Sequence, residues 1–233
     1  MTTRAVFFDL GGTLLVMRRD RVFRRVLSEQ GREVGLEAVH SAYVKVESWW
    51  LSVYGNKALS AEQTNEAYRD LDAKVFLHLF PGEDPAEADR VSKVARARWP
   101  VLEKEVPLVL YPDAEPLLSR LARDGYSMAL VSNAPSDTAK VVEALGLKRY
   151  LQHVVISGIV GYSKPHPEIF RIALRLAGIE PSQAIHVGDL YESDVVGARN
   201  AGIQGVLIDR EGTASNLDCP RIMNLGDIYR YFT

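Results

Sequence analysis

The sequence predicts an α/β protein whose core is a doubly wound parallel sheet, with an all-α segment inserted after the first strand. Three observations carry this prediction: short apolar runs, amphipathic segments between them, and one long stretch without a strand signal. The apolar runs are continuous rather than alternating, which is typical of strands buried on both faces of a parallel sheet. They cover residues 5–8, 127–131, 154–156, 184–187 and 205–208.

Four amphipathic helices are predicted between and after these strands, over residues 113–123, 136–145, 167–177 and 194–201. Each ends near a glycine that can adopt the left-handed conformation favoured at a helix C-terminus. These glycines are Gly125, Gly146, Gly178 and Gly202. A repeated strand–helix order indicates the right-handed connections of a parallel sheet. We therefore assign residues 1–16 and 107–233 to an α/β core.

Residues 17–106 contain four predicted helices and no convincing strand. Apolar residues at three- and four-residue spacing predict helices over 20–30 and 36–54. A capping box at Ser60 opens a third helix that runs to about residue 79. The fourth runs from about 85 to 99 and is expected to end before Pro100. An insertion at this point of the chain would lie over the carboxyl ends of the strands, where open α/β sheets bind ligands.

The composition excludes several classes of protein. Hydrophobic residues make up 47% and charged residues 25%, as in soluble globular domains. The net charge of -2 gives no overall attraction to nucleic acid or to anionic membranes. The single cysteine, Cys219, cannot form an internal disulfide, which favours the cytoplasm. Asp9 interrupts the apolar amino-terminal run and no small-residue cleavage site follows it, so we expect neither a signal peptide nor a membrane helix.

Polar residues follow the predicted strands at their carboxyl ends. Asp9 comes directly after the first strand, and Gly11 and Gly12 let the chain turn sharply and approach a ligand closely. The carboxylates of Asp9, Asp189 and Asp194 would lie close together at this edge and need a counter-ion. Oxygen ligands at an open site suit Mg²⁺. A lysine and hydroxyl groups beside a metal suit a phosphate. The other polar residues of this edge are Thr13, Ser132, Asn133, Lys164, Asp189 and Asp194.

In this order, these residues resemble the four motifs of the haloacid dehalogenase (HAD) superfamily, which joins a Rossmann-like core to an α-helical cap domain. The resemblance covers the whole chain, with residues 17–106 matching the cap. It implies a Mg²⁺-dependent hydrolase of the phosphatase type in which Asp9 is the nucleophile and forms an aspartyl-phosphate. It also implies that Asp9, the backbone carbonyl of Gly11 and Asp189 bind Mg²⁺, with Asp194 completing or orienting that set of ligands.

The resemblance further implies how a phosphate group would be held. Lys164 would be catalytic, because its charge neutralises the repulsion between Asp9 and the phosphate. Thr13, Ser132 and the backbone amide of Asn133 would hold the transferring group in line. The expected partner is a small phosphorylated metabolite, with no nucleic acid and no membrane, and both a monomer and a homodimer remain open. The cap carries no motif that identifies the metabolite.

The sequence departs from the phosphatase pattern at Gly11, where phosphatases of this superfamily usually have a second aspartate. That aspartate would protonate the leaving group and later activate the hydrolytic water. General acid–base catalysis of this kind contributes about 10²–10⁴-fold to rate. Simple alkyl phosphates are therefore expected to turn over poorly unless another group replaces it.

Several explanations of Gly11 remain open. A cap residue or a water molecule can replace the acid, and the candidate donors are His40, His78, Tyr43 and Tyr54. An acyl phosphate or a phosphonate has a leaving group that needs little protonation, although phosphonatase chemistry would require a cap lysine such as Lys45 or Lys57. Dehalogenation is a further alternative, against which the retained Asp189 and Asp194 count. The last is a phosphate-binding regulatory domain with little turnover, against which the retained Asp9 and Lys164 count.

Overall fold

The computed structural model describes residues 2–54, 61–210, 212 and 217–232. The chain forms two compact units, which are considered separately. The first, here called the core unit, comprises Met1–Val16 and Leu108–Thr233. The second, the helical unit, comprises Met17–Pro107.

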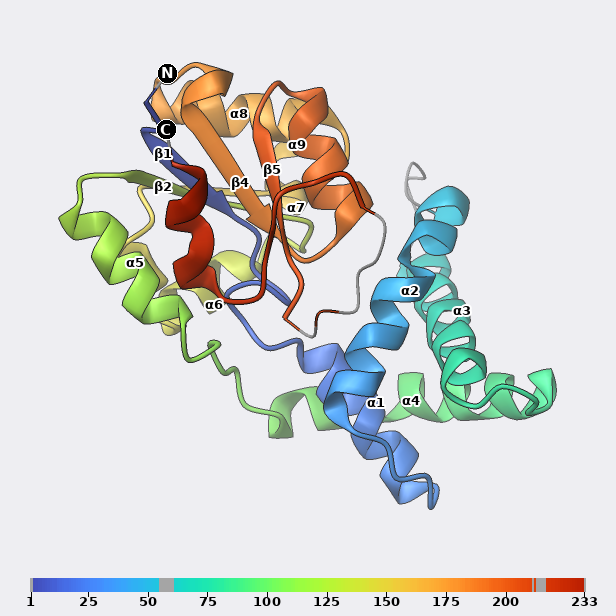
Figure 1. Cartoon of the computed structure of the whole chain (residues 1–233). Helices are drawn as coiled ribbons and strands as arrows, with labels where there is room; N and C mark the ends of the chain where they lie inside the picture. The colour runs from blue at the N-terminus through green and yellow to red at the C-terminus, as the bar shows by residue number, and fades with distance from the viewer. Residues whose placement is uncertain (1, 55–60, 211, 213–216, 233) are drawn as a thin grey trace. The chain divides into compact units, whose positions relative to one another are not determined.

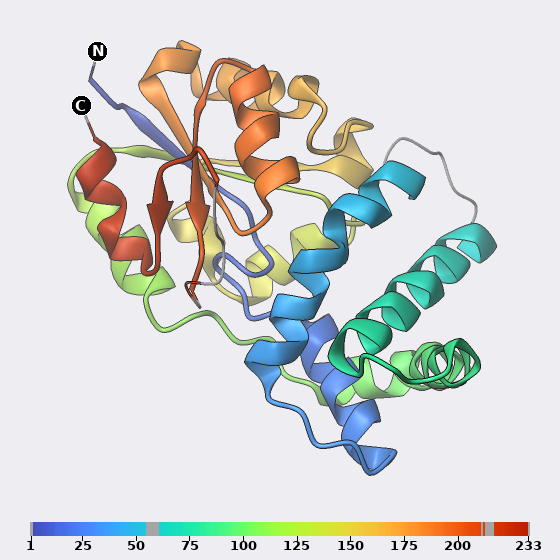
Figure 2. The ribbon, with the colours of Figure 1, turned by 45° about the vertical axis from the view of Figure 1, so that its right-hand side comes forward.

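The core unit contains a six-stranded sheet in the order β3-β2-β1-β4-β5-β6, in which every pairing is parallel. The strands are β1 (Ala5–Phe8), β2 (Ser127–Ser132), β3 (His153–Ile156), β4 (Ala184–Gly188), β5 (Gln204–Ile208) and β6 (Arg221–Ile222). The five predicted strands and the α/β class are thus confirmed. The sixth strand, which pairs with β5 at the edge of the sheet (Figure 2), was not predicted, because two residues are too few to show a pattern.

Helices cover both faces of this sheet, as Figure 1 shows with α5 on one side and α8 and α9 on the other. On the side of α5 (Ala114–Arg123), Val6 and Phe8 of β1 pack in one apolar cluster. On the side of α8 (Pro167–Ala177) and α9 (Gly197–Asn200), Ala5 and Phe7 of β1 pack in another. Alternate residues of β1 therefore serve two separate cores, which explains why the strand is apolar throughout.

The remaining short elements of the core unit are α6 (Thr138–Ala144), α7 (Ser157–Val160) and four 3₁₀ or π turns: η1 (Leu147–Arg149), η2 (Pro181–Gln183), η3 (Tyr191–Val196) and η4 (Leu225–Tyr231). The four glycines predicted to end helices all have a positive φ, between 64° and 82°. The single helix predicted over 194–201 is wrong in form. A π-helical turn, η3, begins earlier and is followed by the short α9.

The helical unit consists, in its described residues, of α1 (Arg18–Glu29), α2 (Leu36–Tyr54), α3 (Ala61–Leu79) and α4 (Pro85–Glu105). These helices pack around an apolar cluster of their own. The predicted end before Pro100 is wrong, because α4 continues through this proline and buries Leu102 in that cluster. Packing thus outweighs the one hydrogen bond that the proline removes. The capping box predicted at Ser60 lies outside the described residues.

The helical unit also buries charged groups. Asp72 on α3 is fully buried, accepts a hydrogen bond from the Tyr43 hydroxyl at 2.5 Å and pairs with Arg96 at 2.6 Å.

No helix within the described part of the chain is long and apolar enough to span a bilayer.

Candidate active site

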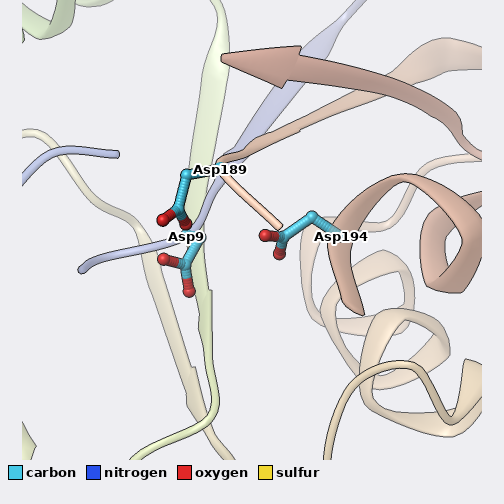
Figure 3. A group of neighbouring side chains, drawn as sticks. All are labelled: Asp9, Asp189 and Asp194. Atoms are coloured by element: carbon cyan, nitrogen blue, oxygen red, sulfur yellow. The ribbon is translucent and has the colours of Figure 1, made fainter. Parts of the chain in front are cut away.

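Three buried carboxylates meet at the carboxyl edge of the sheet. Asp9 follows β1, Asp189 follows the neighbouring β4, and Asp194 lies in η3. One oxygen atom from each lies within 4.8 Å of the others. Figure 3 shows Asp9 and Asp189 side by side, with Asp194 approaching from the turn beyond. Such a concentration of buried negative charge requires cations, and carboxylate oxygens are the donors that hard divalent ions prefer.

Lys164 supplies one cation from within the protein. Its side chain is 3% exposed, and Nζ donates to Asp9 Oδ1 at 2.6 Å and to Asp194 Oδ1 at 2.5 Å. Burial acts to lower the pKa of Lys164, but the two carboxylates outweigh it and the pKa lies above its ordinary value. Lys164 is therefore a cation at every physiological pH.

Asn133 fixes the backbone of Lys164. Its side-chain Nδ2 donates to the Lys164 carbonyl at 2.8 Å, and its Oδ1 accepts from the Lys164 amide at 2.7 Å. Asn133, the residue after β2, thereby fixes the position from which the Lys164 side chain extends to Asp9. This side-chain contact leaves the predicted use of the Asn133 backbone amide untouched.

Asp194 is held by three hydrogen bonds. Besides Lys164, it receives His186 Nε2 at 2.9 Å on Oδ1 and the Leu190 amide at 3.0 Å on Oδ2. Burial acts to raise the pKa of Asp194, but Lys164 and His186 outweigh it and hold the pKa well below its usual range. Of the two roles that the sequence left open for Asp194, these contacts favour orienting its neighbours over direct metal ligation.

Asp9 has the opposite electrostatic balance. Burial raises its pKa to about 6, with Lys164 opposing the shift and Asp194 adding to it. In the folded protein the ionised form of Asp9 is therefore disfavoured relative to the protonated form, compared with the unfolded chain. An additional cation beside Asp9 would favour that form.

Two glycines allow the carboxylates to lie this close to the chain. Gly12 has a φ of 79°, and a Cβ built there would lie 2.0 Å from Asp189 Oδ2. A Cβ on Gly188 would lie 2.0 Å from Cγ of Asp194. Any side chain at these positions would displace a carboxylate, so both glycines are needed for the close packing of the three acids.

Thr13 and Ser132 lie at the same edge of the sheet, in the loop after β1 and at the end of the neighbouring β2. Both are buried. Within residues 2–54, 61–210, 212 and 217–232, no hydrogen-bond partner reaches Thr13 Oγ1. A buried hydroxyl of this kind is available to a ligand.

Sequence reasoning missed two residues that contact this site. One is His186, whose buried ring bonds to Asp194; the available signal was a histidine in an otherwise apolar strand. Arg210 donates to the Thr13 carbonyl at 2.7 Å and to both oxygens of Asp113 at 2.9 and 3.1 Å. No local pattern could have linked Arg210 to a residue so distant in sequence.

The cap donors considered for the role missing at Gly11 are engaged inside the helical unit. The hydroxyls of Tyr43 and Tyr54 donate to Asp72 and Asp70, and His40 contacts Asp20 at 2.7 Å. His78 and Lys45 are exposed on α3 and α2, and Lys57 lies outside the described residues. These contacts weaken the case for Tyr43, Tyr54 and His40 as proton donors.

The family model of haloacid dehalogenase-like hydrolases matches residues 3–202. The chain belongs to this family. The superfamily and the hydrolase class expected from the motifs are thereby confirmed. A phosphoserine phosphatase from Thermus thermophilus is 31% identical over an alignment of 256 positions that covers 98% of each chain. A glyceraldehyde 3-phosphate phosphatase from Pyrococcus furiosus is 38% identical over 96 residues, which is 41% of this chain and 40% of that enzyme.

Solved HAD structures share the fold. A HAD hydrolase from Bacillus subtilis, solved bound to magnesium, aligns over 99% of both chains with a TM-score of 0.68 and 18% identity. A dehalogenase aligns over 99% of this chain and 97% of its own, with a TM-score of 0.66 and 23% identity. At these identities the likeness establishes the architecture and leaves the reaction to be argued from the site.

The raised pKa of Asp9 predicts how Asp9→Asn changes stability with pH. The folded protein binds the Asp9 proton more tightly than the unfolded chain, so ionisation of Asp9 destabilises the fold as pH rises from about 4 to 6. In metal-free buffer at pH 8, Asp9→Asn should be more stable than the wild type, by at most about 3 kcal/mol. The advantage should shrink towards pH 5, where the wild type regains the proton.

Thermal melts in EDTA at pH 5 and pH 8 measure this difference. The exposed Asp137→Asn is the matched control and should show no such pH dependence. A variant that is less stable than the wild type at pH 8 would contradict the electrostatic account of Asp9.

Proposed function

We propose that this hydrolase is a Mg²⁺-dependent phosphatase, in the cytoplasm, that uses Asp9 to attack a small phosphorylated metabolite. The observation that carries the proposal is the ion pair of Lys164 with Asp9 inside a cluster of three buried carboxylates. The similarity to a phosphoserine phosphatase along 98% of the chain supports the same reaction class. In this proposal, residues 1–16 and 107–233 are the catalytic domain, and residues 17–106 are the cap.

The donor set fits Mg²⁺. Asp9 and Asp189 offer carboxylate oxygens on neighbouring strands, and we assign the backbone carbonyl of Gly11 as a third ligand. Asp194, whose oxygens accept from Lys164, His186 and the Leu190 amide, orients this set. When bound, Mg²⁺ offsets the negative charge shared by the nucleophile and the phosphate oxygens.

In the first step a carboxylate oxygen of Asp9 bonds to phosphorus, and the bond from phosphorus to the ester oxygen breaks. The electron pair leaves with that oxygen, which takes a proton from water. In the second step water attacks the same phosphorus and the bond from phosphorus to the Asp9 oxygen breaks, which frees the carboxylate. The attacking water gives up a proton to solvent, and its oxygen leaves in inorganic phosphate. Lys164 opposes the effect of burial on the pKa of Asp9 and offsets the charge on the phosphate, while Thr13, Ser132 and the Asn133 amide hold the phosphate.

Gly11 defines the substrates that suit this site. Glycine has no side-chain acid that could donate a proton, so the leaving oxygen departs with little help from the catalytic loop. Substrates whose leaving group is already a stable anion, such as aryl or acyl phosphates, should therefore turn over faster than alkyl phosphates. The acid cluster favours a phosphatase over a dehalogenase, because a dehalogenase has no use for clustered acids that suit a metal.

Asp9→Asn should abolish hydrolysis, because an amide is a poor nucleophile and cannot form the aspartyl-phosphate. Wild type and variant are assayed with Mg²⁺ on a panel of aryl, acyl and alkyl phosphates, with phosphate release as the measurement. Circular dichroism verifies that the variant is folded. Near wild-type turnover by the purified variant would refute the covalent mechanism.

Millimolar Mg²⁺ should raise the melting temperature, since a ligand that binds only the folded state stabilises it by mass action. At 100 times the dissociation constant the gain is about 2.7 kcal/mol. Asp189→Asn should lose most of it, because it removes a proposed ligand, whereas Asp218→Asn at an exposed position should not. Equal stabilisation of the wild type and Asp189→Asn would exclude Asp189 from the metal site.

Gly11→Asp should raise the turnover of an alkyl phosphate more than that of a nitrophenyl ester. The new carboxyl would supply the missing proton, and only the alkoxide leaving group needs it, with a gain of up to about 10²-fold. At this turn the positive φ belongs to Gly12, which the substitution leaves in place. If the variant is folded and shows no preference for alkyl esters, proton transfer does not limit this enzyme.

A further inference from the structure

His186 occupies a position that the fold would otherwise give to an apolar side chain. It is the third residue of β4, is fully buried, and pairs in register with Phe7 of β1. It faces the same side of the sheet as Ala184, where α8 and α9 pack an apolar cluster. The Phe170 ring and the imidazole pack edge to face, with ring centroids 5.0 Å apart.

Within the described residues, the imidazole of His186 makes its polar contact with Asp194. His186 Nε2 lies 2.9 Å from Asp194 Oδ1, and no partner in the described part of the chain reaches Nδ1. Because a carboxylate accepts and cannot donate, the ring must carry its hydrogen on Nε2. Burying an imidazole among apolar groups is unfavourable, and a single hydrogen bond offsets only part of that cost. Packing therefore gives no reason for a histidine here.

The same oxygen of Asp194 links His186 to the nucleophile. Asp194 Oδ1 also accepts Lys164 Nζ at 2.5 Å, and Nζ continues to Asp9 Oδ1 at 2.6 Å. The Leu190 amide holds the other oxygen of Asp194. His186 and Leu190 thus fix the carboxylate from two sides, and the carboxylate fixes the ammonium group that faces Asp9.

We propose that His186 is a positioning residue for the phosphoryl-transfer step: through Asp194 it holds Lys164 against the nucleophile Asp9. The assignment rests on the proposed function, because it gives Lys164 its role in neutralising the transferring phosphate. It predicts that a substitution at position 186 can leave stability unchanged and still lower activity. The fold tolerates an apolar side chain at position 186, whereas the reaction requires the Nε2 hydrogen.

Two substitutions separate these requirements. His186→Met fills a similar volume without a donor, and His186→Gln keeps an N–H that can reach Asp194. His186→Met should lower kcat on an aryl phosphate by about tenfold or more while KM changes less than about twofold, since Lys164 acts on the transition state. His186→Gln should keep kcat within about threefold of the wild type. The melting temperature of the Met variant should not fall below that of the Gln variant.

His153→Met is the matched control, because His153 lies on β3 of the same sheet and makes no contact with the carboxylates that the structure records. It should leave kcat unchanged. Equal kcat values for His186→Met and His186→Gln would overturn the proposal, whether both are active or both are impaired. A Met variant that loses activity only because it melts at the assay temperature would overturn it as well.

A readout without turnover separates this proposal from the proposed function. Long-range ¹H–¹⁵N NMR of the wild-type protein should show His186 as a neutral ring with its hydrogen on Nε2. Asp194→Asn should change that signal, because the amide no longer presents a full negative charge to the ring. A hydrogen on Nδ1 would overturn the positioning role even if esters are hydrolysed, and failure to hydrolyse any phosphate would overturn the proposed function whatever the ring shows.

Discussion

The burial of Lys164 between Asp9 and Asp194 is the constraint on which the rest of the site depends. An ammonium ion away from water is stable only where carboxylates surround it, and the carboxylates are stable only beside the ammonium ion. With Asp189 included, the cluster still carries more negative than positive charge. A site with this imbalance attracts a further cation and, through it, an anionic ligand. The charge balance therefore supports the proposed metal as much as the ligand geometry does.

Much of the core unit could be predicted because its physical causes are local. Five buried strands show as continuous apolar runs, and the glycines that end α5, α6 and α8 show as breaks in the helical pattern. The acids of the site are equally visible, since parallel strands place their carboxyl ends at one edge. Features with non-local causes were missed. The helix α4 passes Pro100 because Leu102 packs into a distant cluster, and β6 exists because β5 offers it an edge.

The same distinction explains why the contact between His186 and Asp194 was missed. The periodicity of β4 places His186 in the interior and says nothing of Asp194, eight residues away in a turn of unusual form. Only the bend of η3 brings that carboxylate back under the strand. A buried polar side chain in an apolar run is thus a sign of a partner from elsewhere in the chain, and the identity of the partner requires coordinates.

The position of β1 in the middle of the sheet has a consequence for how the molecule is made. Its two neighbours, β2 and β4, begin only at Ser127 and Ala184, so the first strand to leave the ribosome waits unpaired while most of the chain is synthesised. Residues 17–107 need no such wait, because their helices enclose an apolar cluster drawn from that segment alone. The loop that follows β1 gains a late contact when Arg210 reaches back across 197 residues to the Thr13 carbonyl. Nascent chains released before this arginine would hold a finished helical unit and a loop after β1 that lacks the Arg210 contact.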